Sequence, residues 1–336
     1  MKKLSVALVG ATGAVGRAFL EVLDRKGFLR EFNVENFYLF ASARSAGKKL
    51  PLGGKEYVIE ELREDSFDRG IDIALFSAGG DISAKFAPVA ASKGCVVIDN
   101  TSYFRMKPDV PLVVPEVNPQ DIAKHNGIIA NPNCSTTQVV VPLKPLFDKY
   151  GIKRVVYSTY QAVSGAGQGG IDDLTNGLKG EPNTKFAHPI AGNCIPQIDS
   201  FLDNGYTKEE VKMIEETRKI LHAPDVRVTA TCVRVPVYHG HGVSVNVELA
   251  KPFELSDVVD MLKKFPGLVV QNDSAKGEYP MAISAADKDE VFVGRIRRDD
   301  SVENGLNMWV VADNRLKGAA TNSIQIAEIV AKKLGV

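Results

Sequence analysis

The sequence has no long apolar segment and no excess of charge of either sign, and each absence excludes a class of protein. No apolar run approaches the ~20 residues that a helix needs to cross a bilayer. Lysine and arginine together number 41, as do aspartate and glutamate, so the balance gives no indication of a nucleic-acid or membrane surface. We therefore expect neither partner.

Cysteine is also scarce. Cys95, Cys134, Cys194 and Cys232 lie far apart and form no C-x-x-C pair, so we expect neither a disulfide scaffold nor a bound metal. Residues 1–3 lead directly into an apolar run that is too short for the core of a signal peptide. These features favour a reducing, cytoplasmic setting.

The N-terminal residues carry a pattern typical of dinucleotide binding. Apolar residues 4–9 predict a buried strand and residues 17–26 predict a helix, with a G-x-x-G-x-x-G motif between them. Glycines permit the tight turn and let backbone N–H groups approach a pyrophosphate, although a turn that binds nothing is the alternative. The cofactor contacts expected from this loop are Gly10, Thr12, Gly13, Ala14 and Val15.

The second strand, residues 36–41, lacks the acidic residue that usually binds the ribose 2′-hydroxyl of NAD. Arg44 and Ser45 follow it instead, and a guanidinium suits the 2′-phosphate of NADP. We therefore predict NADP as the cofactor, with an ordinary surface arginine as the alternative. Ser77 and Gly79 follow the strand at 71–76, where doubly wound sheets also contact the cofactor.

Helices and strands alternate through the first part of the chain, which predicts an α/β fold with a Rossmann-like parallel sheet. The further elements expected there are a helix at 82–93 and strands at 95–99, 113–116 and 128–130. Arg105 follows one of these strands and is a candidate anion ligand, or else a surface charge.

From about residue 155 the pattern changes to that of an α+β domain with a largely antiparallel sheet. One face of that sheet needs cover, which a dimer partner would supply. The expected elements are strands at 155–163, 226–237 and 241–249, a helix at 209–221, and a C-terminal helix at 318–334 that packs back on the first domain.

Cys134 lies at the start of a predicted helix, directly after Pro132 and Asn133. Asparagine is a good N-cap, and the free N–H groups and dipole at a helix N-terminus stabilise an anion. This setting favours a reactive thiolate, whereas a small buried side chain is the alternative.

His239 and His241 lie two residues apart, so on a strand both side chains point to one face. Either is a candidate acid–base group beside a thiolate, and their spacing alone does not choose between them.

Taken together, the motifs resemble bacterial-type aspartate-semialdehyde dehydrogenases over essentially the whole length. The motifs that carry the resemblance, in chain order, lie at residues 10–16, 42–47, 104–105, 132–136, 161–167, 209–212 and 232–237. Tyr103 stands where that family often has a small residue, Gly192 where a bulkier aromatic is usual, and His239 has no assigned role.

The resemblance implies roles for individual residues. Cys134 would be the nucleophile, and Gln161 would orient the substrate beside it. His241 would be the acid–base residue, because the family's histidine lies seven residues beyond the substrate arginine, here Arg234. The remaining implied contacts are Arg234 to the substrate α-carboxylate, Glu210 to its amino group, Arg105 and Lys212 to phosphate, and Ser164, Gly165 and Asn314 to the nicotinamide.

The resemblance also implies an activity. It predicts reversible, NADPH-dependent conversion of L-aspartyl-4-phosphate to L-aspartate 4-semialdehyde and inorganic phosphate, in the biosynthesis of lysine, threonine, methionine and diaminopimelate, by a homodimer. Residues 1–133 and 314–336 would bind NADP, and residues 134–313 would carry catalysis and dimerisation. The alternatives are another acyl-phosphate reductase, such as one acting on N-acetylglutamyl phosphate, and a non-catalytic NADP-binding regulator.

Overall fold

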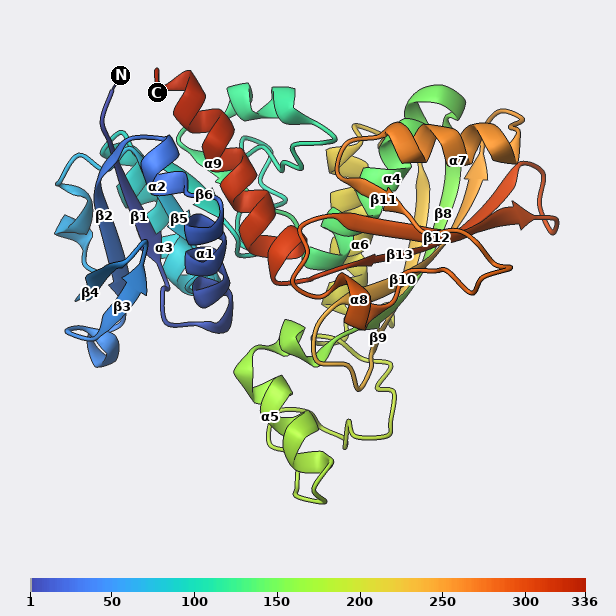
Figure 1. Ribbon diagram of the computed structural model, residues 1–336, viewed down its shortest axis with the longest axis horizontal. Helices are drawn as coiled ribbons and strands as arrows, with labels where there is room; N and C mark the ends of the chain where they lie inside the picture. The colour runs from blue at the N-terminus through green and yellow to red at the C-terminus, as the bar shows by residue number, and fades with distance from the viewer. Residues whose placement is uncertain (1) are drawn as a thin grey trace. The chain divides into compact units, whose positions relative to one another are not determined.

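The computed structural model describes residues 2–336 and divides them into two compact units (Figure 1). Unit 1 combines the chain up to Pro132 with Ala319–Val336, and unit 2 is the continuous stretch Asn133–Gly318. Residues 314–318, expected with the cofactor-binding domain, therefore lie in unit 2. Asn314 exchanges hydrogen bonds with Ser164 of that unit.

Unit 1 is built on a seven-stranded sheet in the order β3-β4-β2-β1-β5-β6-β7. All neighbouring strands are parallel except the β3–β4 hairpin, as the alternating pattern predicts. The strands are β1 (Leu4–Val9), β2 (Val34–Ala41), β3 (Lys49–Leu52), β4 (Lys55–Glu61), β5 (Ile73–Phe76), β6 (Val96–Asp99) and β7 (Ile128–Ala130).

The strand expected at 113–116 is not formed. Only Leu112 makes an isolated bridge, to Ala130 of β7. Pro115 lies within the segment and Pro111 two residues before it, and proline has no N–H to donate to a sheet. The apolar run there fills the core without extending the sheet, since Val113 and Val114 are fully buried.

The helices of unit 1 cover this sheet. The C-terminal helix α9 contacts α1, β5 and β6, which is the predicted return of the chain end to the first domain. The helices are α1 (Ala14–Arg25), α2 (Phe28–Glu31), α3 (Gly80–Ser92) and α9 (Thr321–Lys333), with short 3₁₀ turns η1 (Ala43–Ser45), η2 (Glu64–Phe67) and η3 (Pro119–Lys124).

Unit 2 contains a six-stranded mixed sheet in the order β11-β12-β13-β10-β8-β9. The three pairings of β12–β13, β13–β10 and β10–β8 are antiparallel, whereas β8–β9 and β11–β12 are parallel. The sheet is thus less antiparallel than expected. The strands are β8 (Ile152–Gln161), β9 (Arg227–Arg234), β10 (His241–Leu249), β11 (Leu268–Val270), β12 (Val291–Asp299) and β13 (Gly305–Ala312).

One face of the unit 2 sheet is covered by helices. Along β8, Val155, Tyr157 and Thr159 are fully buried, while the alternate residues Ser158 and Tyr160 reach the other, partly exposed face. None of the helices within residues 2–336 has the length and apolar character needed to cross a bilayer. The helices of unit 2 are α4 (Cys134–Tyr150), α5 (Gln168–Gly177), α6 (Lys208–Ile220), α7 (Leu255–Lys264) and α8 (Ala282–Ala285), with η4 (Val163–Ala166) and the π-turn η5 (Leu316–Ala320), which ends in unit 1.

Candidate active site

Cys134 is the first residue of α4, and Asn133 caps that helix as predicted. The Asn133 side-chain oxygen accepts the N–H of Ser135 at 2.9 Å and of Thr136 at 3.2 Å. The partly exposed thiol therefore lies at the positive end of a 17-residue helix. Gly318 packs directly against it, because a Cβ at 318 would lie 2.7 Å from the Cys134 Cβ.

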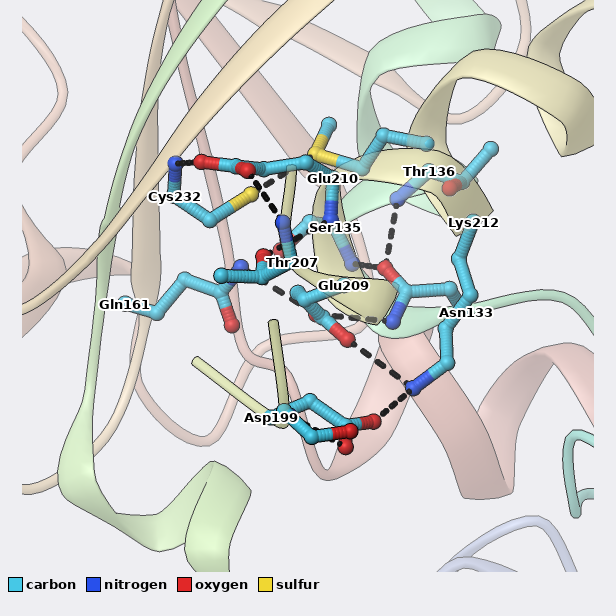
Figure 2. Close-up of polar contacts among 12 residues, drawn as sticks. Asn133, Ser135, Thr136, Gln161, Asp199, Thr207, Glu209, Glu210, Lys212 and Cys232 are labelled. Atoms are coloured by element: carbon cyan, nitrogen blue, oxygen red, sulfur yellow. Dashed lines mark hydrogen bonds and ion pairs between the residues drawn. The ribbon is translucent and has the colours of Figure 1, made fainter. Parts of the chain in front are cut away.

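Asn133 is itself held by two glutamates of α6. Its backbone N–H donates to Glu216 Oε2 at 2.6 Å, and its side-chain amide donates to Glu209 Oε1 at 2.9 Å (Figure 2). Both glutamates are buried. The turn that presents the thiol is thus fixed from both the backbone and the side chain of the preceding residue.

Three predicted site residues meet at one end of the unit 2 sheet. Gln161 and Arg234 are the last residues of the parallel strands β8 and β9 and are paired in register. His241 begins β10, which runs antiparallel to β8, so it lies at the same end. Ala162 joins them further: its N–H donates to His241 Nδ1 at 2.9 Å, and its carbonyl accepts from Arg234 Nη1 at 2.7 Å.

The imidazole of His241 has a defined protonation state. A backbone N–H can only donate, so Nδ1 accepts and the proton of the neutral ring sits on Nε2. Complete burial, with the positive charge of Arg234 as a smaller cause, lowers the pKa of His241 to about 3. Among the described residues Nε2 has no hydrogen-bond partner, so a neutral ring offers one N–H donor there.

Arg234 is also buried, and among the described residues its Nε has no hydrogen-bond partner. Burial lowers the pKa of Arg234, while the negative charges of Glu209 and of a Cys134 thiolate oppose that shift. Gly165 packs closely against the Arg234 guanidinium and the His241 ring, because a Cβ there would lie 2.8 Å from Arg234 Nη1 and 3.3 Å from His241 Nε2. A larger residue at 165 would therefore displace one of these two side chains.

The structure separates the roles of two neighbouring glutamates. Glu209 Oε1 accepts from Gln161 Nε2 at 3.2 Å as well as from Asn133, so its carboxylate lies at the site. Glu210 turns away (Figure 2): its two oxygens accept the backbone N–H groups of Thr207, at the start of α6, and of Cys232 in β9. The Glu210 expected at the substrate amino group is therefore engaged in holding α6 and β9.

The two cations expected at phosphate lie in different units. Lys212 is one turn along α6 from Glu209, and its Nζ lies 3.3 Å from Glu209 Oε2 and 2.8 Å from Asp199 Oδ2. Arg105 is buried in unit 1, where it donates to the carbonyl oxygens of Asn131 and Asn100. Asn131 precedes Cys134 by three residues in the chain.

Unit 1 carries a pocket at the glycine loop expected to bind the dinucleotide. Gly10 has a positive φ, and a Cβ there would lie 2.6 Å from the Ser77 carbonyl oxygen, so only glycine allows this approach. Gly13 is the N-cap of α1 and has no side chain to cap it, which leaves the first N–H groups of the helix, those of Ala14 and Val15, to a ligand. The residues that line the pocket include Gly10, Thr12, Gly13, Ser42, Ala43 and Ser77.

The other predicted cofactor contacts lie near that loop or in unit 2. Arg44 is exposed in η1, between Ala43 of the pocket wall and the buried Ser45, and Gly79 precedes α3. In unit 2, Asn314 bridges two loops. Its side-chain N–H₂ donates to the Ser164 hydroxyl at 3.0 Å, and its side-chain oxygen accepts the Gly240 N–H at 3.1 Å.

The remaining unusual residues lie outside these contacts. Burial is the main cause that lowers the pKa of His239. The positive charge of Arg315 lowers it further, and the carboxylates of Asp313 and Asp287 oppose the shift. Gly192 has a φ of +68°, a conformation that an aromatic residue there would adopt only with strain. Within residues 2–336, no group of three or more His, Cys, Asp or Glu side chains is arranged to hold a metal ion.

Comparisons with known proteins match this chain throughout. The family described as "Semialdehyde dehydrogenase, NAD binding domain" matches residues 5–125, and that described as "Semialdehyde dehydrogenase, dimerisation domain" matches residues 143–317. The aspartate-semialdehyde dehydrogenase of Aquifex aeolicus is 55% identical, over 98% of each chain. Aspartate semialdehyde dehydrogenase II of Vibrio cholerae, complexed with ASA, superposes with a TM-score of 0.93 at 50% identity over 99% of each chain. The enzyme of Candida albicans with NADP gives 0.77 at 28% identity, over 98% of this chain and 99% of that one.

The low pKa of His241 predicts how acid affects folding. Between pH 6.5, the ordinary value, and about 3 the unfolded chain binds the proton and the folded chain does not, so the free energy of unfolding falls as the pH drops through this window. Urea unfolding between pH 7.5 and 4.5 should show a smaller loss of stability in H241N, whose asparagine does not titrate. The exposed H188N is the control. Equal pH dependence in H241N and the native protein would contradict the assignment.

Proposed function

The chain belongs to the aspartate-semialdehyde dehydrogenase family, and we propose that the site around Cys134 carries out that family's reaction with the residues named below. The reaction is the reversible, NADPH-dependent conversion of L-aspartyl-4-phosphate to L-aspartate 4-semialdehyde. Two observations carry the residue assignment: Cys134, at a capped helix N-terminus, lies close enough to the buried Arg234 to act on its charge, and Ala162 hydrogen-bonds both Arg234 and the buried His241.

Cys134 attacks the acyl carbon of the substrate, and the carbon–oxygen bond to phosphate breaks, which leaves a thioester. The N-terminus of α4 stabilises the attacking thiolate. When bound, NADPH supplies the hydride that reduces this thioester. A thiolate suits both ends of the sequence, because it attacks carbonyl carbon readily and leaves readily when the aldehyde forms.

His241 acts on the oxygen of the reduced, sulfur-bound carbon. Its neutral ring donates a hydrogen bond from Nε2–H to that oxygen and stabilises the negative charge there until the carbon–sulfur bond breaks and the Cys134 thiolate leaves. The hydrogen bond from Ala162 keeps the ring in the tautomer that this requires.

Arg234 binds the substrate α-carboxylate, since a guanidinium and a carboxylate form directional paired hydrogen bonds. Glu209, and not Glu210, takes the α-amino group, because only the Glu209 carboxylate lies beside Gln161 and Asn133. Gln161 orients the carbonyl group next to Cys134. Lys212 binds phosphate, and Arg105 is the second predicted phosphate ligand.

NADP is the cofactor, and its pyrophosphate fits the glycine loop at the start of α1. We assign the 2′-phosphate to Arg44 and Ser45 at the end of β2. Ser164, Gly165 and Asn314 remain the proposed nicotinamide contacts.

The relatives do not favour the alternatives. Those at 55% and 51% identity over nearly the whole chain are named aspartate-semialdehyde dehydrogenases, not reductases of N-acetylated substrates. A buried arginine and a glutamate that both lie beside Gln161 also suit a substrate with free carboxylate and amino groups. A non-catalytic regulator would have no use for Cys134 together with His241.

The partly exposed face of the unit 2 sheet is the proposed homodimer interface. Tyr160 and Trp309 pack edge to face on it, with Tyr160 44% exposed, and residues 143–317 match a dimerisation domain. The reaction needs Cys134 as a free thiol, so we propose a reducing, cytoplasmic setting.

The function is tested by following NADPH formation from L-aspartate semialdehyde and NADP. We expect activity that requires phosphate, and C134S should lose nearly all of it, because a hydroxyl at this position is a far weaker nucleophile. C194S, which replaces an exposed cysteine, is the matched control. Activity without phosphate, or substantial turnover by C134S, would overturn the thioester route.

The exchange of roles between the two glutamates predicts opposite phenotypes. E209Q should raise the KM for the semialdehyde about tenfold or more, because a charge-assisted contact to the amino group is worth about 1.5–3 kcal/mol. E210Q should leave that KM near the native value and lower stability by about 1 kcal/mol, the usual cost of a lost helix cap. Kinetics and thermal unfolding of the two variants check this. The reverse pattern would return the amino group to Glu210.

Selectivity for NADP should depend on Arg44. R44A removes a guanidinium–phosphate contact, so kcat/KM with NADP should fall about tenfold or more while that with NAD changes little. R69A, an exposed arginine paired with Glu60 in the same unit, should leave both unchanged. An unchanged NADP/NAD ratio in R44A would remove the assignment.

A further inference from the structure

The segment between β8 and α6 holds Arg234 in two ways that the proposed function does not use. Ile195 and Arg234 exchange two backbone hydrogen bonds, of 2.9 and 2.8 Å, so the segment pairs with the last residue of β9. From the same segment, the ring of Phe186 lies over the Arg234 guanidinium, 5.9 Å from its carbon to the ring centre. The backbone and the charged group of Arg234 are thus both contacted by one excursion of the chain.

Phe186 packs on a small apolar cluster that belongs to this excursion. The excursion includes α5 (Figure 1). The cluster consists of Val163, Leu174, Ile190 and Ile195. Gly170 of α5 makes room for the ring, since a Cβ there would lie 3.2 Å from the Phe186 Cζ. The ring therefore has packing on one side and a cation on the other.

Asp173 fixes the loop that carries Phe186. This carboxylate is 1% exposed and accepts four hydrogen bonds, from the N–H groups of Thr184, Lys185 and Phe186 at 2.7–2.8 Å and from the Thr184 hydroxyl at 3.1 Å. These bonds outweigh burial and hold the pKa of Asp173 below its usual range. Three successive N–H groups on one buried carboxylate leave the loop little freedom.

The ring has a physical effect on the guanidinium. A cation over an aromatic face is attracted by the ring quadrupole, more strongly when both are shielded from water. Arg234 is buried, and its Nη1 is tied to the Ala162 carbonyl. With the guanidinium held by the ring and by Ala162, its Nε, which has no partner among the described residues, is left for a ligand.

We propose that Phe186 is a positioning residue for Arg234 and that Asp173 holds Phe186 in place. The inference rests on the proposed function, in which Arg234 binds the substrate α-carboxylate. Phe186 does not touch the reacting atoms. Its loss would weaken substrate binding and leave the chemical steps and the cofactor affinity unchanged.

The test is steady-state kinetics of F186L with L-aspartate semialdehyde. We expect the KM for the semialdehyde to rise about five- to thirtyfold, the span between an exposed and a shielded cation–π contact, with kcat and the KM for NADP within twofold of native. F201L makes the same change at a residue 58% exposed in the same excursion and should alter nothing. F186M, closer in size to phenylalanine, serves if the leucine variant does not fold.

D173N provides an independent arm. The D173N side chain has an NH₂ group in place of one carboxylate oxygen. That group cannot accept the N–H groups of the loop, so D173N should release the loop and reproduce the KM effect of F186L. D172N, an exposed neighbour on α5, is its control. A KM rise in F186L that is matched by equal changes in kcat and in the KM for NADP would indicate a merely structural role and overturn the proposal.

A double-variant comparison separates this inference from the function beneath it. R234K should raise the KM for the semialdehyde by itself, and F186L should add less than twofold in that background, because both act through one contact. An unchanged KM in R234K would refute the proposed role of Arg234. A raised KM in R234K with a native KM in F186L would refute only the role of Phe186. Full additivity of the two changes would do the same.

Discussion

The hydrogen bonds to Asn133 are the constraint on which the site depends. One residue caps the helix that begins with Cys134, and its own N–H and amide are held by Glu216 and Glu209. Because α6 carries both glutamates, the position of the thiol is set by how α6 packs on β9. Glu210 helps to fix that packing by accepting the Cys232 N–H of β9. A substitution that shifts α6 would therefore also shift the Cys134 thiol, although α6 itself contributes no nucleophile.

The strand order of unit 2 explains how groups distant in the sequence meet. Because β8 and β9 pair in parallel, their last residues, Gln161 and Arg234, lie side by side. The antiparallel β10 begins with His241 at the same end of the sheet. The excursion between β8 and α6 then returns to pair with Arg234 through Ile195. A purely antiparallel sheet would have put Gln161 and Arg234 at opposite ends. The mixed topology is thus required by the site.

Local sequence signals predicted much of this, and long-range contacts account for what they missed. The cap at Asn133 and the glycine loop at Gly10 follow from chemistry within a few residues of chain. Choosing between Glu209 and Glu210 requires the rotation of α6 relative to β9, which adjacent glutamates do not reveal. One local signal favoured Glu209: it lies three residues before Lys212, so on a helix the two side chains share one face. The contact of Phe186 with Arg234 spans 48 positions and left no local pattern.

The path of the chain through the two units has a consequence for synthesis. Unit 2 is one continuous stretch, whereas unit 1 needs both ends of the chain, since α9 packs on α1, β5 and β6. A ribosome releases the strands of unit 1 before unit 2 and α9 after it, and domains fold as units as they emerge. Unit 2 can thus complete its contacts while unit 1 still exposes the apolar surface that α9 will cover. The nascent chain carries an assembled thiol site before its nucleotide-binding sheet is closed.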